Sequence, residues 1–255
     1  MTDRTSVAGR WFQPAEVDSD AALRLFLFPH AGSGASIYKD WPALLPADVA
    51  YQCVQLPGRQ DRRDEETFTE MKQLVDALHD ALVTELDDRP YAFFGHCMGA
   101  QLAYRLAVEI ERAGGRGPVL IGASGWAPEG FLTVTLDQAY MPEQELLDWI
   151  RTLGSVPKEI MDNPEALAMV IPAMRADLAV VASYVDDEAG IRCPVATYSG
   201  RSDQLMQPGA MASWVPRTPH YLGNSEFPGD HFYINSNALA ITGDLLRHAR
   251  RYASV

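Results

Sequence analysis

Apolar positions follow two different patterns along this chain. Short apolar runs bounded by turn residues predict buried strands at residues 23–28, 49–56, 91–94, 118–123 and 194–199, with another near 221–222. Apolar positions at helical spacing predict helices at residues 37–45, 68–86 and 101–113, and polar residues 235–237 supply caps for a last helix through residue 251. Repeated strand–helix units are typical of an α/β fold with a mostly parallel central sheet flanked by helices.

Two parts of the chain depart from this pattern. Residues 1–20 form a polar lead-in, and residues 126–187 contain short helical segments separated by Pro142, Gly154, Pro157, Pro164 and Pro172. We expect a single domain over residues 1–255, in which residues 126–187 form a helical lid inserted between two strands. A helical subdomain with an ordinary packed interior would show the same pattern, because many of its Met and Leu side chains are core in either case.

The strand at residues 91–94 leads into Gly95-His96-Cys97-Met98-Gly99, and helical spacing follows at once. A glycine two residues before and two after a nucleophile, between a strand and a helix, indicates a nucleophile elbow, here with cysteine. We expect Cys97 to adopt strained backbone angles that push its side chain above the sheet. Gly95 and Gly99 are expected because a Cβ at either position would collide with neighbouring backbone. A buried, inert cysteine is the alternative interpretation.

A histidine must follow if Cys97 is a nucleophile. A thiol titrates near pH 8.5, so a base or a cation has to hold it as thiolate at neutral pH. On this type of sheet the order along the chain is nucleophile, acid, histidine. His231, in a loop ahead of the last helix, fits better than His220 at the start of a strand, and His248 is expected on a solvated helix face.

The acid that orients the histidine is expected in the loop after the strand at residues 194–199, where Asp203 lies. Asp230 is the weaker candidate, because the backbone would have to double back to bring it to the neighbouring imidazole. Asp186 and Asp187 precede the strand and are predicted to be surface residues.

Two backbone amides are expected to stabilise the negative charge of a tetrahedral intermediate. One is the amide of Met98, at the N-terminus of the helix that follows the elbow. The other is that of Ala31 in the small-residue loop after the first strand, with His30 as second choice. No metal site is predicted, because His30 and His96 lack a third ligand at suitable spacing, and packing roles are expected for both.

The 255 residues carry a formal net charge of −13, which disfavours nucleic acid and anionic membranes as partners. Arg59, Arg62 and Arg63 are the best candidates for a local basic patch, and a solvated loop is an equally good interpretation of them.

The three cysteines, Cys53, Cys97 and Cys193, include no close pair that would indicate a disulfide framework or a zinc site. The first residues lack the pattern of a secretory signal, and the longest apolar stretch, residues 166–184, contains Arg175 and Asp177. We therefore expect a cytoplasmic protein that does not enter the membrane.

Four segments together resemble the type II thioesterases, the stand-alone editing α/β-hydrolases of polyketide and nonribosomal peptide assembly lines: residues 28–36, 55–59, 95–100 and 229–232. Leu56-Pro57-Gly58-Arg59 is the most discriminating part, and the resemblance covers nearly the whole chain. It implies a triad of Cys97, Asp203 and His231 and a helical lid over an acyl pocket. It also implies a monomer whose substrate is a thioester on the phosphopantetheine arm of an acyl or peptidyl carrier protein, with no cofactor of its own.

Cysteine at position 97 departs from the serine that this family usually has. A serine acyl-enzyme is an oxygen ester, lower in energy than the thioester donor, whereas a cysteine acyl-enzyme is another thioester. Transfer of the acyl group to a second carrier thiol or to an amine is therefore the main alternative to hydrolysis, although dienelactone hydrolases also use Gly-x-Cys-x-Gly. A non-catalytic chaperone that binds carrier proteins is an alternative of another class. A serine replaced by cysteine to trap an acyl-enzyme would also explain this residue.

Overall fold

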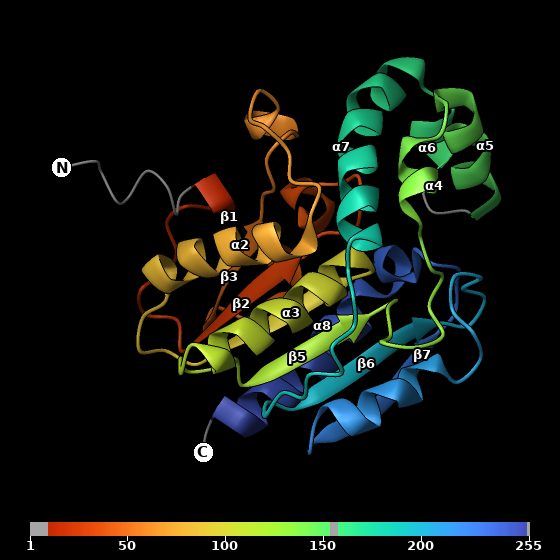
Figure 1. The fold of residues 1–255 in the computed structure, drawn as a ribbon. Helices are drawn as coiled ribbons and strands as arrows, with labels where there is room; N and C mark the ends of the chain where they lie inside the picture. Colours follow the sequence, from red (N-terminus) through yellow and green to blue (C-terminus); the bar gives the residue numbers. More distant parts are fainter. Residues whose placement is uncertain (1–9, 154–157, 254–255) are drawn as a thin grey trace.

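Seven strands form one sheet in the order β1-β3-β2-β4-β5-β6-β7, in a computed structural model that describes residues 10–153 and 158–253 (Figure 1). The strands are β1 (Phe12–Gln13), β2 (Leu23–Phe28), β3 (Val49–Val54), β4 (Tyr91–His96), β5 (Leu120–Ser124), β6 (Val195–Gly200) and β7 (Tyr221–Phe227). All neighbours are parallel except β1, which pairs antiparallel with β3. The predicted mostly parallel sheet is therefore confirmed.

Helices cover both faces of this sheet, which explains why β2, β4 and β5 read as continuous apolar runs and are buried throughout. Helices α2 (Met71–Glu85) and α3 (Met98–Arg112) pack on one face. On the other face lie α8 (Tyr233–Ala253) and the 3-10 turns η1 (Ala35–Tyr38) and η2 (Pro42–Leu44). Two further 3-10 turns are η3 (Gln60–Arg62) and η4 (Ala210–Arg217).

A helical insertion separates β5 from β6. It contains α4 (Leu136–Tyr140), α5 (Glu143–Leu153), α6 (Lys158–Met161) and α7 (Pro164–Ala182), which stand together beyond the sheet in Figure 1. A separate apolar cluster holds these helices together, with Leu146, Ile150, Ile171, Met174 and Leu178 among its buried members. The expected interruption at Pro172 is wrong, because this proline lies inside α7. Gly154 and Pro157 lie outside the described residues.

Three other expectations change. The polar lead-in contains β1, and its residues 1–9 lie outside the described part of the chain. The helix expected at 37–45 is replaced by η1 and η2, because Pro42 lacks the N–H that a continuous α-helix would need. The last helix begins at Tyr233, and Asn237, instead of capping it, forms a kink at φ −117° and ψ 15°. There the Asn237 side-chain amide donates to the carbonyl oxygen of Tyr233 at 2.7 Å.

Parallel pairing brings the chemically interesting loops to one edge of the sheet. Phe28 at the end of β2 lies beside Gly95 of β4, and Gly200 at the end of β6 lies beside Phe227 of β7. The loops that follow these carboxyl ends carry the candidate residues, and this edge is where open α/β sheets bind their ligands. No helix in the described ranges is both long enough and apolar enough to span a membrane.

Candidate active site

The turn between β4 and α3 holds Cys97 in a strained conformation, with φ 55° and ψ −122°. A Cβ on Gly95 would lie 2.2 Å from the carbonyl oxygen of Gly99, and a Cβ on Gly99 would lie 2.1 Å from that of Phe28. Both distances are well below contact, so only glycine fits at either position. The prediction of a tight strand-to-helix turn with obligatory glycines is confirmed.

His231 and Asp203 lie together at the same edge of the sheet. The Nδ1 atom of His231 is 2.7 Å from Oδ2 of Asp203, and the other carboxylate oxygen accepts the amide of Leu205 at 2.9 Å. The two side chains are 4% and 1% exposed, so water does not compete for this hydrogen bond. Asp230 is exposed, and it accepts the amide of Phe232 rather than contacting the imidazole.

The other nitrogen of His231, Nε2, is buried without a hydrogen-bond partner among the described residues. Cys97 lines the same pocket, and it is the half-buried cysteine of the three. Burial alone would lower the pKa of His231, but the neighbouring Cys97 thiolate and the hydrogen bond to Asp203 raise this pKa from 6.5 to about 10. The raised pKa keeps the His231 imidazole protonated beside the Cys97 sulfur at neutral pH.

Backbone amides without a partner among the described residues border this site. The N–H groups of Ala31 and Met98 donate to no described residue, and Met98 begins helix α3, where the first amides have no partner within the helix. In the same loop the Gly32 amide donates to the Asp177 carboxylate, and the Ser33 amide donates to the carbonyl oxygen of His30. The amide of His30, the second choice, is also unpaired among the described residues, so both choices remain.

The remaining histidines have different surroundings. His96 packs its ring 4.8 Å from that of His231, and burial together with repulsion by His231 holds the pKa of His96 well below its ordinary value. Burial also lowers the pKa of His30 to about 4, so both are neutral packing residues, as predicted. His248 is half-buried rather than solvated and lies 3.6 Å from Asp244. Among the described residues, no group of three or more His, Cys, Asp or Glu side chains could hold a metal ion.

Two of the three arginines expected in a basic patch or a solvated loop have structural partners instead, whereas Arg63 is exposed. Arg59 forms a buried ion pair with Asp177 of α7, and Arg62 is paired with Glu65. Asp177 is a site-supporting residue that the sequence analysis did not identify, although a carboxylate inside the apolar run 166–184 requires a buried partner. Asp187 is exposed, as expected, and Asp186 is half-buried; they bind the buried arginines Arg105 and Arg217, respectively.

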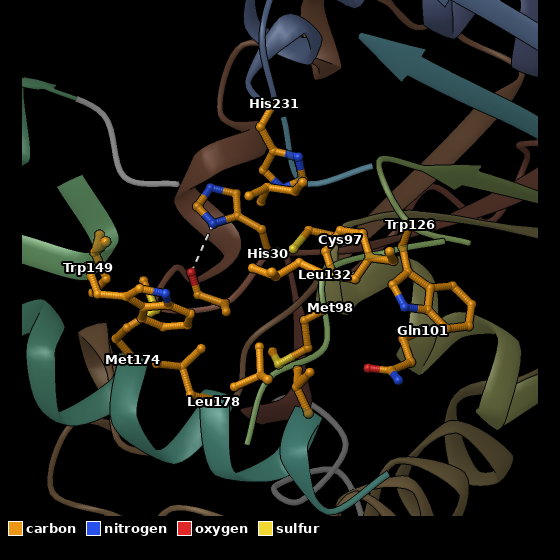
Figure 2. Close-up of a pocket in the computed structure, with 16 residues that line it drawn as sticks. His30, Cys97, Met98, Gln101, Trp126, Leu132, Trp149, Met174, Leu178 and His231 are labelled. Carbon is orange, nitrogen blue, oxygen red and sulfur yellow. Dashed lines mark hydrogen bonds between the residues drawn. The ribbon is translucent and has the colours of Figure 1, made fainter. Parts of the chain in front are cut away.

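An apolar pocket of about 50 Å³ extends from Cys97 and His231 under the helical insertion (Figure 2). Side chains from the sheet side and from α5 and α7 line it, including Met98, Trp126, Phe131, Trp149, Met174 and Leu178. Gln101, one helical turn after the cysteine, is the polar lining residue that lies away from the His30 side of the pocket. A cysteine, a buried His–Asp pair, two free amides and an apolar pocket can together support acyl transfer.

Known proteins resemble this chain in sequence and in fold. Residues 23–250 match the thioesterase domain family. The gramicidin S biosynthesis protein GrsT of Aneurinibacillus migulanus is 30% identical over 230 residues, which are 90% of this chain and 90% of GrsT. Thioesterase PikA5 of Streptomyces venezuelae is 30% identical over 256 residues, which cover 97% of this chain and 89% of PikA5. The structure of the type II thioesterase BorB from the borrelidin biosynthetic cluster matches with a TM-score of 0.84 at 30% identity, covering 94% of this chain and 97% of BorB.

A mostly parallel seven-stranded sheet with a nucleophile elbow after β4 and a helical insertion after β5 defines an α/β-hydrolase. Within that class, the chain belongs to the thioesterase family and is a type II thioesterase, a hydrolase of thioesters. The family resemblance and the fold expected from the sequence are confirmed.

Proposed function

We propose that this thioesterase releases acyl groups held as thioesters on the phosphopantetheine arm of acyl or peptidyl carrier proteins in polyketide or nonribosomal peptide biosynthesis. The relatives support this pathway assignment, since GrsT is named for gramicidin S biosynthesis and BorB for the borrelidin cluster. The observation that carries the chemistry is the thiol of Cys97 at a strained elbow beside the buried His231–Asp203 pair.

In the proposed first half-reaction, the thiolate of Cys97 attacks the thioester carbonyl carbon. The amides of Met98 and Ala31 donate to the oxyanion, and His231 gives its proton to the departing pantetheine sulfur. In the second half, His231 takes a proton from water, whose oxygen attacks the acyl-enzyme. The acid leaves, and the Cys97 thiolate and the imidazolium are regenerated. Asp203 holds the imidazole in the required tautomer throughout.

The carrier arm has a separate approach to the cysteine. A hollow of about 550 Å³ adjoins the acyl pocket at His30 and Ala31, and it reaches Met169 of α7, which is 70% exposed. We assign this hollow to the pantetheine arm and place the docked carrier domain near the insertion. Residues 126–187 would then act as a lid within a single domain of residues 1–255, since Trp149 and Met174 from it border the pocket.

Acyl transfer to a second carrier or to an amine is the competing outcome, because a cysteine acyl-enzyme conserves the energy of the thioester. The test is intact mass spectrometry of a loaded carrier protein mixed with the enzyme and an empty second carrier. Free acid with an unloaded second carrier supports hydrolysis, and acyl mass on the second carrier supports transfer. The Cys97→Ser variant should raise hydrolysis relative to transfer, because its oxygen ester lies lower in energy.

The same experiment tests the nucleophile and the non-catalytic alternative. Cys53 and Cys193 are buried, and burial raises the pKa of Cys53 to about 12 and that of Cys193 further, so an acyl adduct should map to Cys97 alone. The Cys97→Ala variant should bind the carrier and form no adduct. Unchanged turnover in that variant would show that the nucleophile is misassigned, and full biological activity without turnover would favour a chaperone. We further expect a cytoplasmic location and a monomer. Light scattering of the purified protein would check the monomer.

A further inference from the structure

The acyl pocket contains a buried side-chain amide, that of Gln101, which the proposed chemistry does not use. Gln101 lies four residues after Cys97 on α3, one helical turn along, which corresponds to a rise of about 6 Å. Its side chain is 2% exposed and lines the pocket beside Trp126, on the side away from His30 and Trp149 (Figure 2).

The side-chain amide of Gln101 has no partner in the part of the chain that the structure describes. Its Oε1 atom is buried without a hydrogen bond, and neither end of the side-chain amide bonds to any residue in the described ranges. Leaving a buried amide unpaired costs free energy, whereas leucine or methionine would fill the same space among apolar neighbours without that cost. A ligand that forms a hydrogen bond with the Gln101 amide removes this cost, which explains why a polar side chain is retained in the pocket.

We propose that Gln101 is a specificity residue that recognises a hydroxyl or amino group on the acyl chain, a few bonds from the thioester carbonyl. This inference rests on the proposed function, because it assigns the pocket to the acyl group. A plain alkyl chain would bury the amide without a partner, and sites built for a hydrogen bond reject analogues that lack it. The preferred substrates are therefore oxygenated or aminated acyl groups rather than saturated fatty acyl groups.

The test compares pantetheine thioesters of hexanoic, β-hydroxyhexanoic and δ-hydroxyhexanoic acids, with hydroxyls at two distances from the carbonyl. For at least one hydroxylated substrate, the wild-type kcat/KM should exceed that of the hexanoyl thioester by about tenfold. Gln101→Leu should remove this preference while retaining or raising hexanoyl hydrolysis. It should also leave thermal stability unchanged or raised, because it removes an unpaired buried group.

Leu178→Met is the matched control. Leu178 lines the same pocket, and a volume-conserving apolar exchange there should change all three rates by the same factor. Equal wild-type rates for all three thioesters would overturn the proposal. A Gln101→Leu variant that loses stability but keeps the wild-type preference would overturn it too, since Gln101 would then be structural.

A binding measurement separates this proposal from the proposed catalytic function. Non-hydrolysable amide analogues of the three acyl-pantetheines are titrated into Cys97→Ala and into the double variant with Gln101→Leu. Tighter binding of a hydroxylated analogue to the first protein, and no such difference in the second, supports Gln101 even if turnover fails. Equal affinity of all three analogues in both proteins refutes it even if turnover succeeds.

Discussion

Asp177 of α7 accepts two hydrogen bonds from the guanidinium of Arg59, one at 2.5 Å and the other at 2.7 Å. The carboxylate oxygen that receives the shorter bond also accepts the amide of Gly32 at 2.7 Å. One buried carboxylate thus connects the helical insertion to the loop that carries the free amide of Ala31. The arginine belongs to the Leu-Pro-Gly-Arg segment. The ion pair with Asp177 therefore gives that motif a structural role in this protein.

Asp177→Asn should impair both stability and catalysis. Loss of the carboxylate leaves the Arg59 charge buried and uncompensated, which is expected to cost about 3–5 kcal/mol of unfolding free energy. Under conditions where the variant stays folded, displacement of the Ala31 loop should lower kcat roughly 100-fold, the effect of a misplacement of about 1 Å. Denaturant unfolding and steady-state kinetics measure the two effects separately.

The matched control is Asp186→Asn. Asp186 also receives two hydrogen bonds from one buried arginine, Arg217, at 3.0 and 2.6 Å, but that pair does not contact the Ala31 loop. This variant should lose stability and keep its kcat when folded. If Asp177→Asn behaves in the same way, Asp177 does not position the loop.

Asp203→Asn should lower kcat by roughly 10²–10⁴-fold, the range of one acid–base group, because the amide can hold the imidazole in the wrong tautomer. Asp230→Asn should leave kcat nearly unchanged, since the exposed Asp230 side chain accepts the amide of Phe232 and no other bond from the described residues. Rates measured with one acyl-pantetheine substrate provide the comparison. Equal losses in the two variants would mean that Asp203 is not the orienting acid.

The protonation of His231 should depend on its sulfur neighbour. Because the folded-state pKa is raised from 6.5 to about 10, the cation contributes stability that is complete below about pH 6.5 and is lost as pH rises through about 10. In Cys97→Ala the thiolate is gone, so the pKa should fall and the loss should begin at lower pH. NMR titration of the His231 ring in the two proteins tests this. Identical titration curves would show that the thiol does not lie beside the imidazole.

Gly99→Ala should prevent formation of the elbow. Its Cβ would lie 2.1 Å from the Phe28 carbonyl oxygen, so β2 and α3 could not keep their separation. We expect loss of soluble protein or a large fall in unfolding free energy. Gly243→Ala, on the exposed side of α8 where a Cβ meets nothing within 4 Å, should instead raise that free energy by about 0.5–1 kcal/mol. Similar behaviour of the two variants in urea unfolding would contradict the steric explanation.

Much of the fold could be predicted because strands that helices cover on both faces of the sheet appear in the sequence as short apolar runs. Most of the predicted strands and the helix after the elbow appear within a few residues of their expected positions. The antiparallel strand β1 was not predicted, since two residues are too few to show the alternation of apolar and polar positions that indicates a strand. The expected helix at 37–45 failed because two 3-10 turns share the apolar spacing of one helix.

The sequence by itself determined the elbow, because a sharp turn between strand and helix requires glycines at fixed distances from Cys97. It also determined the order of Cys97, Asp203 and His231 along the chain. Only the tertiary structure decided which carboxylate meets the imidazole, that Asp177 holds the Ala31 loop through Arg59, and that Gln101 lacks a partner. These facts depend on contacts between residues far apart in the chain, and such contacts leave no local pattern because packing selects partners by position in space.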